Sequence, residues 1–164
     1  MADRRRLVYW DANIFLTYIE DTPGRLPALD ALLASAATGH NVAIATSAVS
    51  LTEVAFAEAE KRSRALDPDI EAAIEALWNS PGITLVEFDP VIGRAARDLV
   101  RGSIITRPGL KPIDAIHLAT ALSIQVTEFH TYDANLHKHS GRLGFPIITP
   151  PLPEGRPEDN APEP

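Results

Sequence analysis

The sequence predicts an α/β fold of three layers, with helices on both faces of a central, mainly parallel sheet of about five strands. Two observations carry this prediction. Short apolar runs alternate along the chain with segments of helical periodicity, which is the pattern of strands joined by helical crossovers. The 164 residues are 45% hydrophobic and 23% charged, as in ordinary soluble domains. A chain of roughly 150 residues buries about 70% of its unfolded surface, so we expect one domain.

Five apolar runs are the expected strands, at Leu7–Trp10, Val42–Thr46, Ile83–Phe88, Val126–Thr131 and Phe145–Thr149. Helices are expected between them, at Asn13–Glu20, Ala28–Ala37, from Ser47 to about Arg64, Ile70–Trp78, Val91–Val100 and Ile113–Ser123, with a loop from Val100 to Pro112. Gly39 is expected to end the second helix, and Asp67 with Pro68 signals the turn before the fourth. Because crossovers between parallel strands are right-handed, residues that follow the strands share one edge of the sheet.

Composition excludes several classes of protein. There is no cysteine, so disulfides and thiolate metal ligands are excluded, and a metal would be bound by oxygen or imidazole. No apolar run reaches the roughly 18 residues that span a bilayer, and the apolar start at Leu7–Trp10 is too short for a secretory signal. We therefore expect a cytoplasmic protein without membrane contact. The net charge of -7 argues against nucleic-acid binding over the whole surface, although it allows a local basic patch.

The end of the chain differs in composition from the rest. Residues 150–164 are rich in proline and acidic residues and contain almost nothing apolar. Such a segment cannot bury enough surface to offset the entropy lost on ordering it. We expect residues 1–149 to form the folded domain and residues 150–164 to be a disordered tail.

Four acidic residues lie far apart in the chain, yet each stands where an apolar stretch meets a turn or opens a helix: Asp11, Glu53, Asp114 and Asp133. An isolated buried carboxylate takes up a proton rather than stay charged, because desolvation of the ion is costly. Several converging carboxylates are therefore expected to share a cation. With oxygen ligands, Mg²⁺ or Mn²⁺ is the expected ion.

Each aspartate also has a purely structural explanation. Asp11 and Asp133 both begin the tripeptide Asp-Ala-Asn and could be N-caps of the helices that follow. Asp114 follows Pro112 at the start of a helix, where a carboxylate complements the positive helix end. That helix is otherwise apolar, and only Asp114 and His117 interrupt its surface, which favours a functional role for Asp114. His117 is expected to be a core histidine bonded to a neighbour rather than a ligand.

The role of Glu53 depends on where its helix begins. If Ser50 is the N-cap, Ser50 and Glu53 form a capping box, in which serine and glutamate satisfy each other's backbone donors. If Ser47 is the N-cap, Glu53 lies well inside the helix and the capping explanation fails. The sequence leaves both open.

These segments together resemble the PIN-domain family of metal-dependent nucleases, and within it the small VapC-like toxin ribonucleases. The resemblance extends over about Leu7–Thr149 and rests on four segments in order: Val8-Tyr9-Trp10-Asp11-Ala12-Asn13, Ser50-Leu51-Thr52-Glu53-Val54, Asp114-Ala115-Ile116-His117-Leu118-Ala119-Thr120-Ala121 and Thr131-Tyr132-Asp133. By this resemblance the family's acids correspond to Asp11, Glu53, Asp114 and Asp133, and its accessory polar positions to Asn13 and Thr131. The chain departs from the family at Asn135 and Leu136, where relatives often carry a further acid, and in lacking a glycine after the Asp114 helix.

The resemblance implies a metal-dependent endoribonuclease, the toxin of a type II toxin–antitoxin pair. Asp11, Asp114 and Asp133 would hold Mg²⁺ or Mn²⁺, directly or through water, and Glu53 would contact the metal or the attacking water. Asn13 and Thr131 would orient ligands or contact phosphate. General chemistry agrees, since a metal ion among carboxylates can activate water for hydrolysis of a phosphodiester. The implied partners are an RNA substrate, a cognate antitoxin and a second copy of the chain in a homodimer.

Residues for substrate binding are less clearly marked. A path for the phosphate backbone could run along four basic residues, Arg101, Arg107, Lys111 and Lys138. Tyr132 or His137 could stack on a base. His137 and His139 lie two residues apart and would not share one face of a helix, so they are discounted as a metal pair.

Other classes of function stay open. A PIN-like module could bind RNA or a partner protein without cutting. A receiver-like signalling domain also places aspartates around Mg²⁺ at strand ends, but it usually needs an adjacent acidic pair and a phosphoacceptor on a middle strand, and the sequence offers neither. An aspartyl phosphatase is disfavoured because Asp11-Ala12-Asn13 lacks the second acid of its acid–base step.

Overall fold

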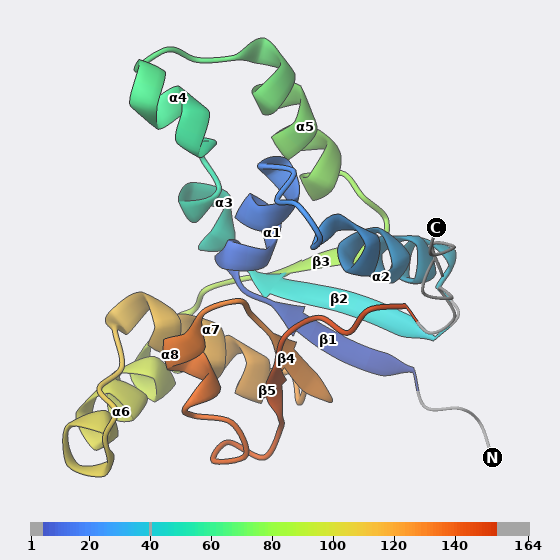
Figure 1. Ribbon diagram of the computed structural model, residues 1–164. Helices are drawn as coiled ribbons and strands as arrows, with labels where there is room; N and C mark the ends of the chain where they lie inside the picture. Colours follow the sequence, from blue (N-terminus) through green and yellow to red (C-terminus); the bar gives the residue numbers. More distant parts are fainter. Residues whose placement is uncertain (1–4, 40, 154–164) are drawn as a thin grey trace, which may run out of the picture.

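The computed structural model of the chain describes residues 5–39 and 41–153. Its centre is a five-stranded parallel sheet in the order β3-β2-β1-β4-β5, with helices on both faces (Figure 1). The strands are β1 (Arg6–Trp10), β2 (Val42–Ser47), β3 (Ile83–Val86), β4 (Glu128–His130) and β5 (Ile147–Ile148). The predicted three-layer α/β fold is confirmed.

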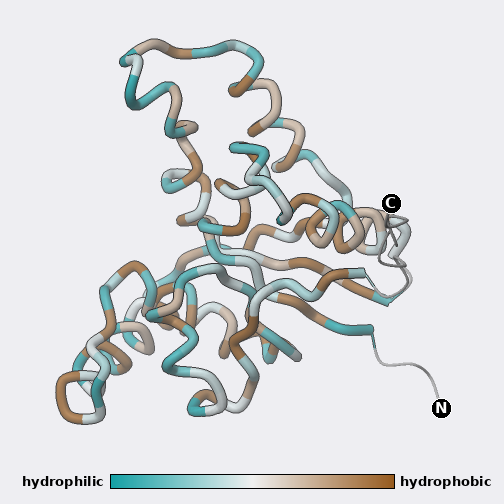
Figure 2. Tube along the Cα trace, viewed as in Figure 1, coloured by the Kyte–Doolittle hydropathy of each residue, from teal (hydrophilic) through white to brown (hydrophobic). Residues whose placement is uncertain are grey.

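The central strand β1 shows why these apolar runs form a buried sheet. Val8, Tyr9 and Trp10 are fully buried, and Val8 pairs with Ile44 on β2 and with Glu128 on β4. Successive side chains of a strand enter opposite layers, and both layers are apolar when helices cover both faces. Val8 and Trp10 accordingly pack in one hydrophobic cluster and Tyr9 in another. Figure 2 shows hydrophobic residues along the strands.

Two layers of helices enclose the sheet. The layer over Val8 contains α1 (Ala12–Ile19), α2 (Leu26–Thr38) and α5 (Pro68–Trp78), which bury Ile14, Leu29 and Leu77 against it. On the opposite face, α6 (Pro90–Thr106) packs closely on α7 (Pro112–Ser123), and Leu118 of α7 contacts the cluster around Tyr9. Three short helices lie in the connections: α3 (Ser50–Glu53), α4 (Glu58–Ser63) and α8 (Ala134–His137).

The prediction of one long helix from Ser47 to about Arg64 is wrong. The chain forms two short helices there, α3 and α4, with residues 54–57 between them. Val54 ends α3 with a non-helical backbone (φ -93°, ψ 54°) and is fully buried, so burial of this side chain interrupts the helix. Glu60 then stabilises α4 as a separate unit, since its carboxylate accepts from the backbone N–H of Ala57 at 3.0 Å and of Asp67 at 2.7 Å.

Helix α6 is longer than expected, because it continues to Thr106 through the stretch for which a loop was expected. Ser103 accounts for this continuation. Its buried hydroxyl donates to the carbonyl of Val100 at 2.7 Å and accepts from the backbone N–H of Leu110 at 3.0 Å. The same side chain therefore supports the last turns of the helix and ties the following loop back to them.

The signals expected at two helix ends are confirmed. Gly39 follows α2 in the left-handed conformation with φ 70°, which glycine adopts without steric cost. Asp67 caps α5, since its carboxylate accepts from the backbone N–H of Asp69 at 2.9 Å. These ends depend on local chemistry alone, which is why the sequence predicts them.

The chain beyond the last strand is described only in part. Residues 150–153 form neither helix nor strand, and residues 154–164 of the expected tail lie outside the described residues. Across the part of the chain that is described, no helix is both long and apolar enough to span a bilayer.

Candidate metal and catalytic site

The four acidic residues selected from the sequence line one cavity of about 360 Å³ at the carboxyl edge of the sheet. Asp11 follows β1, Asp133 follows β4 after two residues, Asp114 lies in the first turn of α7, and Glu53 is the last residue of α3. The complete lining is Asp11, Ala12, Asn13, Glu53, Asp114, His117, Tyr132, Asp133 and Ala134. Tertiary structure therefore brings together carboxylates from four separate segments.

Asp11 is the most deeply buried of these acids, with 4% of its surface exposed. It caps α1 by accepting from the backbone N–H of Ile14 at 3.2 Å, so the N-cap explanation is correct but incomplete. The pKa of Asp11 is raised to about 6, mainly by burial and to a smaller extent by the negative charge of Asp114, although a hydrogen bond from Thr131 lowers it. The carboxylate is thus held where its negative charge is costly.

Asp114 and Asp133 interact through their charges. Burial raises the pKa of Asp114, and the second cause is the negative charge of Asp133, which Lys111 partly offsets. Asp133 caps α8 by accepting from the backbone N–H of Asn135 at 2.8 Å. Its own backbone N–H donates to the hydroxyl of Thr131 at 2.9 Å. Thr131 therefore contacts both Asp133 and Asp11, and the two strand-end acids are linked through it.

The helix that carries Glu53 has neither of the two N-caps considered from the sequence, Ser50 or Ser47. Helix α3 begins at Ser50 after Val49, and the Ser50 hydroxyl is paired with the Thr46 hydroxyl at 2.8 Å rather than with the backbone of Glu53. Oε2 of Glu53 instead lies 2.6 Å from Nε2 of His117. Glu53 is the last residue of α3, and its side chain points toward His117 of α7. This orientation places its carboxylate at the cavity.

A directed chain of hydrogen bonds runs behind Glu53. The backbone N–H of Ser47 donates to the Tyr9 hydroxyl at 2.9 Å, so this hydroxyl can donate to Nδ1 of His117, 2.8 Å away. His117 then carries its proton on Nε2 and donates it to Glu53. His117 is a buried histidine bonded to its neighbours, as expected. Sequence reasoning missed Tyr9, although a tyrosine inside a strand that is buried on both sides calls for a partner for its hydroxyl.

Three further candidate residues, Asn13, Tyr132 and His137, each contact another part of the protein. Asn13 lines the cavity and accepts from the backbone N–H of Tyr132 at 3.3 Å, which joins the start of α1 to the end of β4. The Tyr132 ring, a candidate for stacking on a base, already carries the guanidinium of Arg25 at 3.9 Å from its centroid. His137 is paired with the carbonyl of Thr131 at 2.9 Å, which leaves its imidazole tied to the backbone rather than directed to a metal.

The donor set of the cavity fits a hard divalent cation. Within the described ranges no three acidic or histidine side chains are already close enough together to form a ligand cage. Mg²⁺ does not need one, because it keeps several waters and usually takes one or two carboxylates together with phosphate oxygens. Burial is the main cause that raises the pKa of Asp11 and of Asp114, and neighbouring carboxylates add to it, so a cation in the cavity would offset the cost of keeping both ionised.

Comparison with known proteins identifies the family. A model of the PIN domain matches residues 8–141. Among solved structures, VapBC2 from Rickettsia felis, bound to a DNA fragment from its promoter, has a TM-score of 0.63 and 14% identity over 87% of this chain and 98% of that chain. The Sarcin-Ricin loop cleaving toxin VapC20 from Mycobacterium tuberculosis has a TM-score of 0.60 and 15% identity over 87% and 99%.

A toxin–antitoxin complex from Klebsiella pneumoniae has a TM-score of 0.55 and 23% identity, over 87% of this chain and 97% of that chain. At these identities the solved structures show a shared fold, and no curated protein sequence matches the chain. The family match spans the segments that carry the three aspartates of the cavity as well as Glu53. The chain therefore belongs to the PIN-domain family of nucleases, and the resemblance drawn from its motifs is confirmed.

Proposed function

We propose that this protein is a metal-dependent endoribonuclease and the toxin of a type II toxin–antitoxin pair. The observation that carries the proposal is the convergence of Asp11, Glu53, Asp114 and Asp133 on one cavity, with the pKa of Asp11 and of Asp114 raised. Acids that only cap helices gain nothing from being close to one another. Perturbed acids gathered in a cleft are typical of sites that bind a cation and a charged substrate.

In this proposal Asp11, Asp114 and Asp133 hold Mg²⁺ or Mn²⁺, directly or through water. A bound ion of this kind lowers the pKa of water and offsets charge that builds on the phosphate. Glu53 has Oε2 occupied by His117, which leaves Oε1 to accept a proton from the attacking water. Asn13 and Thr131 keep the ends of β1 and β4 in register, and Lys111, whose charge acts on Asp114, contacts the phosphate backbone.

The similar structures support the proposed partners. Several of them are complexes of a toxin with its antitoxin, and one is described as cleaving the Sarcin-Ricin loop. We infer a cognate antitoxin that blocks the acidic cavity, an RNA substrate with structured regions, and a homodimer. The family match removes the receiver-like alternative, whereas a PIN domain that binds RNA or protein without cutting remains the second candidate.

The direct test is incubation of the purified protein with a Sarcin-Ricin loop hairpin and with transfer RNA, in Mg²⁺, in Mn²⁺ and in chelator. We expect discrete cleavage products with either metal and none in chelator. The Asp114→Asn protein should bind the same RNA and leave it intact. Binding by the wild type in Mg²⁺ without loss of intact RNA would favour the non-cleaving alternative, and equal cleavage by Asp114→Asn would contradict the proposed site.

A further inference from the structure

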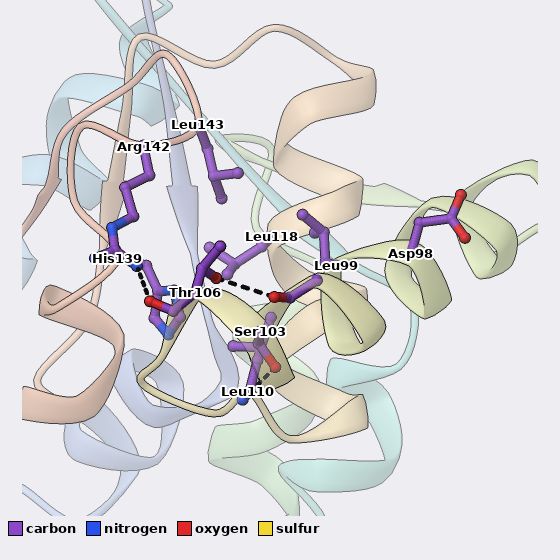
Figure 3. Close-up of a pocket in the computed structure, with 10 residues that line it drawn as sticks. Asp98, Leu99, Ser103, Thr106, Leu110, Leu118, His139, Arg142 and Leu143 are labelled. Atoms are coloured by element: carbon purple, nitrogen blue, oxygen red, sulfur yellow. Dashed lines mark hydrogen bonds between the residues drawn. The ribbon is translucent and has the colours of Figure 1, made fainter.

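A second cavity, of about 470 Å³, lies between α6, α7 and the chain that follows α8 (Figure 3). Its walls are mostly apolar and come from Leu99, Leu110, Leu118 and Leu143. Cavities of this size and composition, with a few polar groups placed in them, are typical of sites for small molecules or parts of larger ones. None of the residues of the acidic cavity lines it.

The polar groups come from two basic side chains, His139 and Arg142, and from Asp98, Ser103 and Thr106. Figure 3 shows His139 and Arg142 on one side of the cavity and Leu99 on the other. His139 is only 8% exposed, and its imidazole has no hydrogen-bond partner among the described residues. Arg142 is held in place, because its Nη1 donates to the carbonyl of Arg107 at 3.0 Å. The ring nitrogens of His139 are not sealed from solvent, so this imidazole can form hydrogen bonds to a molecule in the cavity, beside the fixed guanidinium of Arg142.

The second cavity is a neighbour of the acidic one. Asp114 and Leu118 are four residues apart on α7, hence on the same face of that helix, and they line the acidic cavity and the second cavity respectively. The negative charge of Asp114 also acts on His139. A chain bound with a phosphate at the acids would therefore place an adjacent group within reach of the second cavity.

We propose that this second cavity binds one nucleobase of a single-stranded stretch of the RNA substrate. This inference rests on the proposed ribonuclease function and names a site for substrate recognition. Apolar walls suit the face of a base, and His139 and Arg142 offer a ring and a guanidinium plane on which unstacked bases pack.

The chemistry of the cavity favours a base over a free phosphate. Burial lowers the pKa of His139 and the charge of Arg142 lowers it further, while the charge of Asp114 acts in the opposite direction; the net lowering favours the neutral imidazole. A neutral imidazole has one donor and one acceptor, which matches the edge of a base. Phosphate is negatively charged, and its desolvation against four leucines, in a cavity that Asp98 also lines, would be costly.

Gly102 provides a clean way to block this cavity. It lines the cavity within α6, and a Cβ atom built on it meets nothing within 4 Å. Gly102→Leu therefore adds a side chain in open space, and Gly102→Ala is its matched control because both residues favour a helix but only leucine fills volume. His139→Ala removes the unpartnered imidazole as an independent variant.

The experiment measures binding of short, fluorescently labelled single-stranded RNAs by anisotropy in chelator, where the proposed nuclease leaves them uncut, with intact RNA verified on a gel. In a series of probes an abasic site replaces each nucleotide in turn, so the number of phosphates stays constant. We expect one abasic position to weaken binding to the wild type by roughly five- to 100-fold. Gly102→Leu and His139→Ala should abolish this difference, and Gly102→Ala should keep it.

Four results would overturn the proposal. The first is a wild type that binds all abasic probes as tightly as the parent RNA, and the second is a Gly102→Leu protein that keeps the wild-type preference. The third is inorganic phosphate that competes with RNA for the wild type but not for Gly102→Leu, which would indicate an anion site. A change in sedimentation of Gly102→Leu without a change in base preference would likewise assign the cavity to a protein contact.

Failure of this proposal and failure of the nuclease proposal can be told apart. Cleavage is lost in Asp114→Asn if the acids act as proposed, whatever occupies the second cavity. A wild type with a base preference that Gly102→Leu removes, but without cleavage in any metal, would retain the nucleobase site and contradict the nuclease. Cleavage by a wild type that shows no base preference would support the nuclease and contradict the nucleobase site.

Discussion

The amino and carboxyl ends of the paired strands β1 and β4 differ in how far neighbouring groups compensate their carboxylates. At the amino end, Arg6 forms an ion pair with Glu128, and Nε2 of His130, the last residue of β4, lies 3.6 Å from Oε2 of the same glutamate. His130 first, and Arg6 after it, lower the pKa of Glu128. At the carboxyl end, burial is the main cause that raises the pKa of Asp11 to about 6, and the charge of Asp114 adds to it. At the amino end the charge of Glu128 is compensated by its neighbours, whereas at the carboxyl end the negative charges of Asp11 and Asp114 are compensated only in part.

The largest effect that tests this comparison is on catalysis. We expect Asp114→Asn to reduce the rate of RNA cleavage in Mg²⁺ by roughly 100-fold or more, since it removes a carboxylate from the metal site. The same change should leave the melting temperature in chelator equal or higher, because it removes repulsion from Asp133. A parallel series of cleavage rates and thermal unfolding curves checks both. A large fall in melting temperature together with retained cleavage would place Asp114 among ordinary structural acids.

The second prediction concerns pH and Asp11. The pKa of Asp11 is about 6 in the folded protein, against an ordinary value of 3.8 for an aspartate, so the folded state binds more protons between these pH values. In chelator, this group therefore lowers stability above pH 6, and the loss disappears as the pH falls through 6 toward 4. The free energy of unfolding in chelator therefore rises on this acidification by at most about 3 kcal/mol.

Asp11→Asn should flatten this pH dependence and keep the N-cap of α1, because asparagine is an equally good cap. Urea unfolding of both proteins at pH values from 4 to 8 gives the difference in free energy that isolates Asp11. Identical pH profiles for the two proteins would contradict the assignment. Saturating Mg²⁺ should remove the penalty at high pH in the wild type alone.

The third prediction concerns the orientation of Glu53. Glutamine at position 117 reaches about as far as Nε2 of histidine, whereas asparagine reaches only as far as Nδ1. His117→Gln therefore keeps a donor to Glu53, and His117→Asn keeps only the group that faces Tyr9. We expect kcat to fall by roughly tenfold or more in the asparagine protein and much less in the glutamine protein, with KM similar in both. Equal losses of kcat in the two proteins, in step with their melting temperatures, would mean that His117 has a packing role only.

The smallest effect is expected at the amino end of the strand pair. Glu128→Gln removes the ion pair with Arg6, whose side chain is 46% exposed, so the loss of stability at pH 7 should be about 1 kcal/mol or less. Because the pKa of Glu128 is lowered in the fold, this contribution is present above its unfolded pKa and is lost as the pH falls through the folded pKa. Unfolding curves at pH 7 and at pH 3 measure it. Cleavage should stay at the wild-type rate. A large loss of activity would contradict a purely structural role for the amino end of the strand pair.

Much of the fold could be predicted because it depends on local pattern. The apolar runs at the five strands, the glycine after α2 and the aspartate before α5 act through burial, backbone freedom and capping, all of which are properties of a few adjacent residues. The helix expected from Ser47 failed for a non-local reason. Burial of Val54 and the double hydrogen bond of Glu60 outweighed the helical periodicity of the segment.

The acidic residues themselves were determined by the sequence alone, since Asp11, Glu53, Asp114 and Asp133 can be selected from their positions beside apolar runs. Tertiary structure alone decided that they face one cavity and that Glu53 is held by His117 and Tyr9. The physical reason is distance along the chain. Tyr9 and His117 are 108 residues apart, so their contact depends on the order of parallel strands and the packing of α7 on them, which no short stretch of sequence encodes.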